Sequence, residues 1–88
     1  MTADEYKELN ERIEKYESYD KTLQSLIRFR GCLKSGISLI RPVGGTTYED
    51  IFCGDMVFGD GFQELVTQKV TEAFDEQIRR VEEQMEEL

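Results

Sequence analysis

The stretch from Tyr6 to Arg30, YKELNERIEKYESYDKTLQSLIRFR, decides the fold because its apolar side chains recur at alternating steps of three and four residues. That spacing is typical of a helix with a coiled-coil seam. Thr2 and Glu5 form a capping box before the stripe, and Gly36 follows it as a helix-ending residue. The pattern therefore predicts one long helix over about residues 3–34. The seam positions are Tyr6, Leu9, Ile13, Tyr16, Asp20, Leu23, Ile27 and Arg30.

A second apolar stripe with helical spacing fills the C-terminal third of the chain. Asp60, between Gly59 and Gly61, is a natural N-cap, and Gln63 completes a pair that resembles a capping box. We therefore expect a second helix over about residues 61–88. Its stripe consists of Phe62, Val66, Val70, Phe74, Ile78, Val81, Met85 and Leu88.

Between these helices, two short runs rich in β-branched and aromatic residues flank a segment that contains proline and glycine. The runs are Ile37–Arg41 and Tyr48–Cys53, and the segment is Pro42–Thr47. This pattern predicts a β-hairpin with a turn longer than two residues, or two strands that do not pair. We expect a single α+β domain over residues 1–88. Two long helices form an antiparallel helical hairpin in it, with a short β-hairpin at about residues 36–58 between them.

The size of the chain points to assembly. It has 88 residues, 39% of them apolar, which is enough to fold at a formal net charge of −8. A domain of this length buries only roughly 60% of the surface that its unfolded chain exposes. Two paired helices alone leave part of both stripes uncovered. We therefore expect a homo-oligomer with a coiled-coil component, whose number of copies the sequence leaves open.

The amino-acid composition limits which catalytic or metal-binding chemistry the chain can perform and where in the cell it is expected. The chain has no histidine that could activate either of its cysteines, Cys32 and Cys53, so we expect no catalytic residue, no metal ligand and no cofactor. No secretory signal opens the chain, and no apolar run approaches the roughly 20 residues of a membrane-spanning helix. We expect a cytoplasmic protein without membrane contact. The two cysteines are then small buried side chains, with a disulfide between them as the alternative.

Charge is distributed unevenly along the chain. Residues 1–20 carry seven acidic and three basic side chains, residues 49–88 carry twelve and three, and residues 21–48 carry five basic and no acidic ones. The acidic ends oppose duplex nucleic acid, which needs a longer basic stripe. The basic centre suits a small anion, because a few arginines can hold a phosphate. The alternative is that these arginines pair with acidic residues of the second helix or of another copy.

The Gly44–Thr47 segment adds to the basic centre, because glycine amides and threonine hydroxyls can donate to phosphate oxygens. An ordinary hairpin turn is the alternative, since the segment matches no phosphate-binding glycine motif. Arg30 continues the helix seam, so we expect it to face inward and to meet Arg41 from the β segment. The candidate ligand-binding residues are Arg28, Arg30, Lys34, Arg41, Gly44, Gly45, Thr46 and Thr47.

The order of these features resembles that of small accessory proteins encoded by bacteriophages and prophages. The resemblance spans the chain and is carried by a helix ending in KSGISL (residues 34–39), a β segment reaching IFCGD (51–55) and an acidic C-terminal helix. It implies a role against bacterial defence, since some such proteins sequester nucleotide second messengers and others bind a defence protein. A second similarity is to the prefoldin chaperone subunit, whose β-hairpin lies between two longer coiled-coil helices. Neither resemblance assigns a role to any residue.

Two functions follow as expectations. The first is a non-enzymatic, oligomeric sponge of the phage anti-defence type, which sequesters an anionic nucleotide at the basic centre. The second is a protein-interaction module whose acidic helices bind and inhibit a host defence protein. The ligand is a small nucleotide in the first, and the partner is a basic protein surface in the second.

Overall fold

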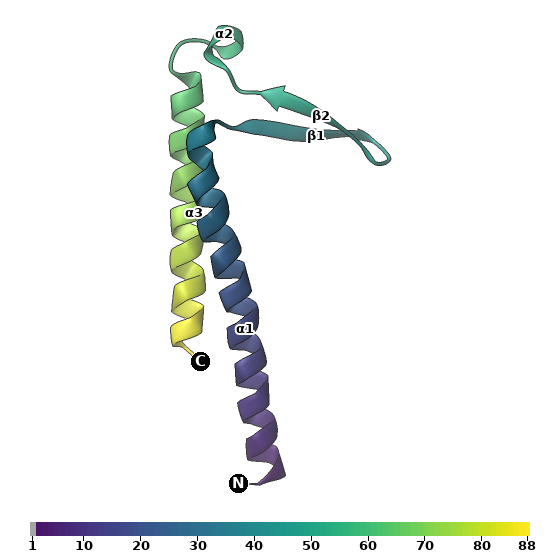
Figure 1. The fold of residues 1–88 in the computed structure, drawn as a ribbon, viewed down its shortest axis with the longest axis vertical. Helices are drawn as coiled ribbons and strands as arrows, with labels where there is room; N and C mark the ends of the chain where they lie inside the picture. The colour runs from purple at the N-terminus through teal and green to yellow at the C-terminus, as the bar shows by residue number, and fades with distance from the viewer. Residues whose placement is uncertain (1) are drawn as a thin grey trace.

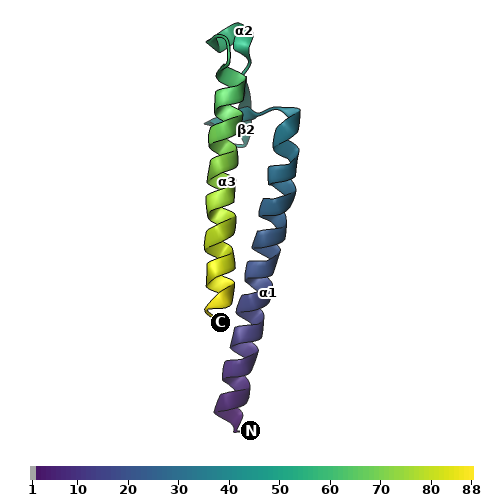
Figure 2. The same ribbon diagram turned by 90° about the vertical axis from the view of Figure 1, so that its left-hand side faces the viewer.

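The structure is a computed structural model that describes residues 2–88, with Phe52 described by its backbone alone. Its elements are α1 (Ala3–Cys32), a 3-10 turn η1 (Leu33–Ser35), β1 (Ser38–Gly44), β2 (Thr47–Phe52), α2 (Asp55–Phe58) and α3 (Phe62–Glu86). The two long helices lie side by side and run in opposite directions, and the strands project from one end of the pair (Figures 1 and 2). The predicted α+β class is confirmed.

The ends of α1 follow from local hydrogen bonding. The Thr2 hydroxyl accepts a hydrogen bond from the Glu5 amide at 3.2 Å, as the capping box predicts. At the other end the α-helix stops at Cys32, two residues before the predicted boundary, because the chain tightens into η1. Gly36 then takes a φ of 103°, which only glycine adopts readily, and turns the chain away from the helix.

The start of α3 is capped by a residue that the sequence pattern did not indicate. Asp55 accepts hydrogen bonds from the amides of Gln63 at 2.8 Å and Gly61 at 3.1 Å. The predicted N-cap, Asp60, does not fill this role, since Gly61 occupies the N-cap position. The short helix α2 turns the chain back on itself, so that Asp55 reaches amides that have no partner in the first turn of α3.

The two strands form an antiparallel sheet with Leu39 opposite Ile51. Gly44 pairs with Thr47, so the turn holds two residues and is shorter than predicted. The register shifts across Val43, and this irregularity absorbs the additional residue of the segment.

Gln63 ties the strands to α3. With its amide oriented to satisfy both partners, its nitrogen donates to the Cys53 carbonyl at 2.6 Å and its oxygen accepts from the Ile37 amide at 2.9 Å. Ile37 precedes β1 and Cys53 follows β2. One side chain of α3 therefore holds the start of β1 and the end of β2 together at the base of the two-stranded sheet, which we call the ribbon.

A single copy has almost no core. Its extents are 64 × 31 × 15 Å and its radius of gyration is 19.0 Å, against about 12 Å for a compact domain of this length. Cys53 and Val81 are the only buried apolar residues among the side chains described. Cys32, which we expected to be buried, is exposed at the end of α1, and both cysteines are free. None of the described helices is long and apolar enough to cross a membrane.

Candidate functional site

Arg30 joins α1 to α3. Its guanidinium forms an ion pair with Asp75 through two hydrogen bonds, from Nε to Oδ1 and from Nη2 to Oδ2, the second at 3.3 Å. These hydrogen bonds hold the pKa of Asp75 below its ordinary value and raise the pKa of Arg30. Arg30 faces the other helix, as predicted, but it meets this carboxylate and not Arg41. The alternative interpretation of the arginines, pairing with the second helix, therefore describes Arg30 in this structure.

The other cations of the basic centre lie apart from Arg30. Arg41 on β1 donates from Nη2 to Oε2 of Glu49, across the sheet on β2, at 2.6 Å. Arg28 lies over the ring of its neighbour Phe29, with 5.0 Å between its Cζ and the ring centroid. Lys34 lies in the 3-10 turn. Neither Arg28 nor Lys34 makes a salt bridge within residues 2–88.

The Gly44–Thr47 segment forms the tip of the ribbon, and Figure 1 shows this tip pointing away from both helices. Gly44 and Gly45 have φ angles of 143° and 52°, which suit the tight turn. Within one copy the eight candidate residues therefore occupy three places: the end of α1 with its 3-10 turn, the middle of the sheet, and the tip. An anion that touches all of them would have to lie between copies.

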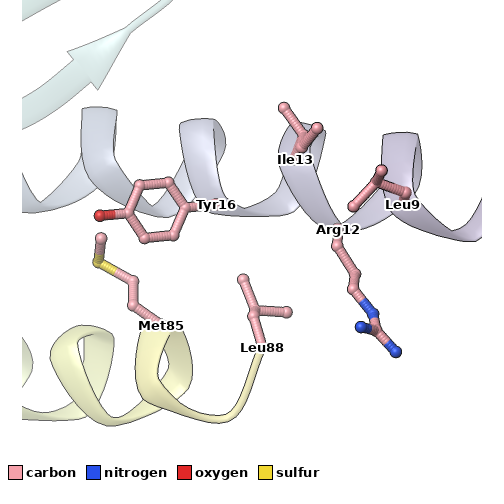
Figure 3. A pocket seen from close by; sticks show the side chains of 6 residues that line it. All are labelled: Leu9, Arg12, Ile13, Tyr16, Met85 and Leu88. Carbon is pink, nitrogen blue, oxygen red and sulfur yellow. The ribbon is translucent and has the colours of Figure 1, made fainter.

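A groove opens at the opposite end of the helix pair, where α3 ends against the side of α1. We call it the open-end groove; its volume is about 440 Å³, and it is lined by Leu9, Arg12, Ile13, Tyr16, Met85 and Leu88. Figure 3 shows Tyr16 and Met85 facing each other across it, with Leu88 below Ile13. Leu9, Ile13 and Tyr16 are 43%, 47% and 51% exposed. The floor is thus apolar and accessible.

Carboxylates surround this floor. Two smaller hollows adjoin the groove and share residues with it. The carboxylates that line them, which we call the rim carboxylates, are Glu8, Glu11, Glu82, Glu86 and Glu87, and the cations that line the same hollows are Arg12 and Lys15. Within residues 2–88 none of the rim carboxylates makes a salt bridge. On α3, Glu72, Glu76 and Glu83 are instead each paired with a cation of the same helix.

Sequence reasoning missed the open-end groove because it expected part of both stripes to lie outside the helix pair but did not locate which turns are uncovered. The usable signal was the unequal length of the two predicted helices. In the structure α1 has 30 residues and α3 has 25. The N-terminal turns of α1 therefore extend past the end of α3, and their apolar residues lack a neighbour from that helix.

No group of three or more His, Cys, Asp or Glu side chains arranged to hold a metal ion occurs in the part of the chain that the structure describes. Comparisons of the chain with protein-family models, curated proteins and solved structures found no match. The function is therefore argued from the geometry of the groove, the ribbon and their charges.

Proposed function

We propose that the chain is a non-enzymatic, homo-oligomeric binding protein that engages another protein through the acidic end of its helices. The open-end groove is the observation that carries this proposal, because it combines an exposed apolar floor with carboxylates that have no ion-pair partner in the described chain. Apolar patches with a polar border are typical of protein–protein contact sites. In this proposal α1 and α3 act as one antiparallel helical hairpin that presents the groove.

Self-association is assigned to the other end of the molecule. Exposed apolar side chains occur there on both faces of the two-stranded sheet, on α2 and near the start of α3. We call them the hairpin-end surface, and they are Leu39, Ile40, Val43, Tyr48, Met56, Val57, Phe58 and Leu65. A two-stranded ribbon alone is marginal in water. Contact between copies at this surface would supply the core that one copy lacks. It would also keep the acidic open ends apart, where like charges repel.

The identity of the partner rests on the resemblance to small phage proteins. That resemblance favours a host defence protein, inhibited in the host cytoplasm by occupation of one of its surfaces. The acidic character of both helix ends supports a partner with a basic surface, because complementary potentials favour association.

The proposal is tested by comparing the wild-type chain with the variant Glu82→Lys, Glu83→Lys, Glu86→Lys and Glu87→Lys. We expect the wild-type chain to capture a specific protein from host extract and the variant to lose it at unchanged helix content. Light scattering of the wild-type chain should report at least twice the chain mass of 10.3 kDa. A monomeric mass at every usable concentration, or capture that survives charge reversal, would contradict the proposal.

Sequestration of an anionic nucleotide is the second candidate. It is favoured by Arg28 and Lys34, which have no salt bridge within residues 2–88, and by the glycine amides of the ribbon tip. Its site would have to be completed between copies. A nucleotide at 100 times its dissociation constant adds about 2.7 kcal/mol to stability, so a rise in Tm across a panel of cyclic and linear nucleotides would reveal it.

A further inference from the structure

The apolar stripe of α1 continues beyond the helix that covers it. Leu23 of this stripe, and Leu26 beside it, are half-buried where α1 runs beside α3. Towards the N-terminus the same stripe continues through Tyr6, Leu9 and Ile13, which are 60%, 43% and 47% exposed. Figures 1 and 2 both show the N-terminal end of α1 extending past the C-terminal end of α3. A stripe at three- and four-residue spacing thus lacks its second helix over its first turns.

The shape of the open-end groove suits a helix. Two neighbouring helices form its walls, and Leu9 to Tyr16 is a rise of about 10 Å along α1, close to two turns. Side chains spaced at i, i+3, i+4 and i+7 on a third helix can enter between such walls. An added strand would need a free strand edge, and both strands of the structure lie at the other end of the molecule.

The charge of the rim decides which helix fits. The hollows beside the groove are lined by five rim carboxylates and two cations, Arg12 and Lys15, and none of the five carboxylates is neutralised by a salt bridge within residues 2–88. A second copy docking by its own open end would bring acidic residues against acidic residues, which is unfavourable. A helix with lysine or arginine beside its apolar stripe would pair with the rim and cover the floor together.

We propose that the open-end groove binds a basic amphipathic helix of a partner protein, with the apolar face of that helix against Leu9, Ile13 and Met85 and its cations against the rim carboxylates. This inference rests on the proposed protein-binding function and gives the chemistry of its partner. The bound helix lies beside the first turns of α1 and completes a three-helix arrangement at the end of α3.

The experiment uses the purified full chain and three synthetic peptides of about 18 residues, long enough for measurable helicity. The first peptide has leucines on one helical face and lysines elsewhere. The second has the same composition with leucines spread around the helix, and the third has glutamate in place of lysine. We expect the first peptide to bind at least tenfold more tightly than either of the others by fluorescence anisotropy, and to weaken as salt screens the rim.

Variants place the binding in the groove. Leu9→Asp and Ile13→Asp should each weaken binding of the first peptide at least tenfold. The helix content of both variants should stay unchanged, because both residues are exposed. The matched control is Glu76→Gln on α3, which removes a carboxylate paired within its own helix and should leave peptide affinity unchanged. Light scattering should show the same mass for Ile13→Asp as for the wild-type chain.

Three results would overturn the inference: equal binding of the basic and acidic peptides, binding that survives both groove variants, or dissociation of the oligomer by Ile13→Asp, which would assign the groove to a second copy. If instead the proposed protein-binding function is wrong, the experiments give a different result. In that case the first peptide still distinguishes the groove variants, but no charge-dependent capture of a host protein occurs.

Discussion

Arg30 and Asp75 form the only salt bridge that joins α1 to α3 within residues 2–88. Both side chains are solvent-exposed, so the pair adds little to the overall stability of the fold. Its two hydrogen bonds instead fit one position of α3 along α1. A slip of one turn would move α3 by about 5.4 Å and displace Met85 and Leu88 from the open-end groove.

The first prediction tests this positioning role. Asp75→Asn keeps the shape of the side chain but removes the charge that holds the Arg30 guanidinium. We expect helix content to stay unchanged while affinity for the basic peptide falls several-fold, because the two walls of the groove lose their fixed alignment. The Glu76→Gln variant is again the control. Unchanged peptide affinity in Asp75→Asn would show that apolar packing alone sets the register.

The second prediction concerns pH. Hydrogen bonds from the amides of Gln63 and Gly61 lower the pKa of Asp55, and those from Arg30 lower the pKa of Asp75. A carboxyl whose pKa is lower in the folded state stabilises the fold at pH values above its unfolded pKa, and the contribution is lost as pH falls through the folded pKa.

We therefore expect the urea midpoint of the wild-type chain, relative to that of the double variant Asp55→Asn and Asp75→Asn, to decline as the pH falls below about 4, the ordinary pKa of an aspartate. Measuring the difference cancels the effect of the other carboxylates, which titrate in both chains. A difference that stays constant over this range would contradict the assigned hydrogen bonds.

The third prediction concerns Val81, the only buried residue of α3. Val81→Ala removes two carbon atoms from the helix seam and should lower the free energy of unfolding by about 2 kcal/mol. Ile27 on α1 is 48% exposed, so Ile27→Ala should lower the free energy of unfolding by less than Val81→Ala does, unless another copy covers Ile27. Denaturant titration at two protein concentrations separates these cases, because a contact between copies makes the loss depend on concentration.

The cysteines give the fourth prediction. Cys53 is 2% exposed and follows β2, whereas Cys32 is exposed at the end of α1. Cys53→Ala should therefore lower stability by about 1–2 kcal/mol, and Cys32→Ala should change it by less than about 0.5 kcal/mol. Urea titration under reducing conditions measures both. Equal losses of stability in the two variants would contradict the different burial of the two cysteines. A mass lower by two hydrogens under non-reducing conditions would contradict their free state.

The helices could be predicted from the sequence because periodicity and capping are local. The three- and four-residue steps around Leu9 and Leu23, and the hydroxyl of Thr2 three residues before Glu5, act within one or two turns. The N-cap of α3 could not be predicted in the same way. Asp55 reaches the start of that helix only because α2 folds the chain back, and the local pattern favours Asp60 instead.

The candidate site was harder to predict because it depends on which residues meet across the fold. Arg30 and Arg41 are close in sequence, yet each pairs with a carboxylate that the fold brings to it. Asp75 is 45 residues from Arg30 along the chain, and the antiparallel packing of two helices alone places them together. Charge counts along the sequence identify a basic segment, but they do not show whether its cations have intramolecular partners.

The last prediction separates the two candidate functions through these arginines. A nucleotide sponge needs cations that are available to phosphate, and within residues 2–88 Arg28 and Lys34 have no salt bridge whereas Arg30 and Arg41 have one each. If a nucleotide binds, Arg28→Ala should weaken its binding free energy by about 1.5–3 kcal/mol, the range for a hydrogen bond to a charged group. Arg30→Ala should instead loosen the helix pair.

For the protein-binding function we expect a different outcome. No nucleotide in the panel should raise Tm, and Arg28→Ala should leave both Tm and capture of the host protein unchanged. Arg30→Ala should reduce capture, because Asp75 loses its partner and the groove its alignment. A nucleotide that raises Tm in the wild-type chain but not in Arg28→Ala would reverse this assignment and make sequestration the function of the chain.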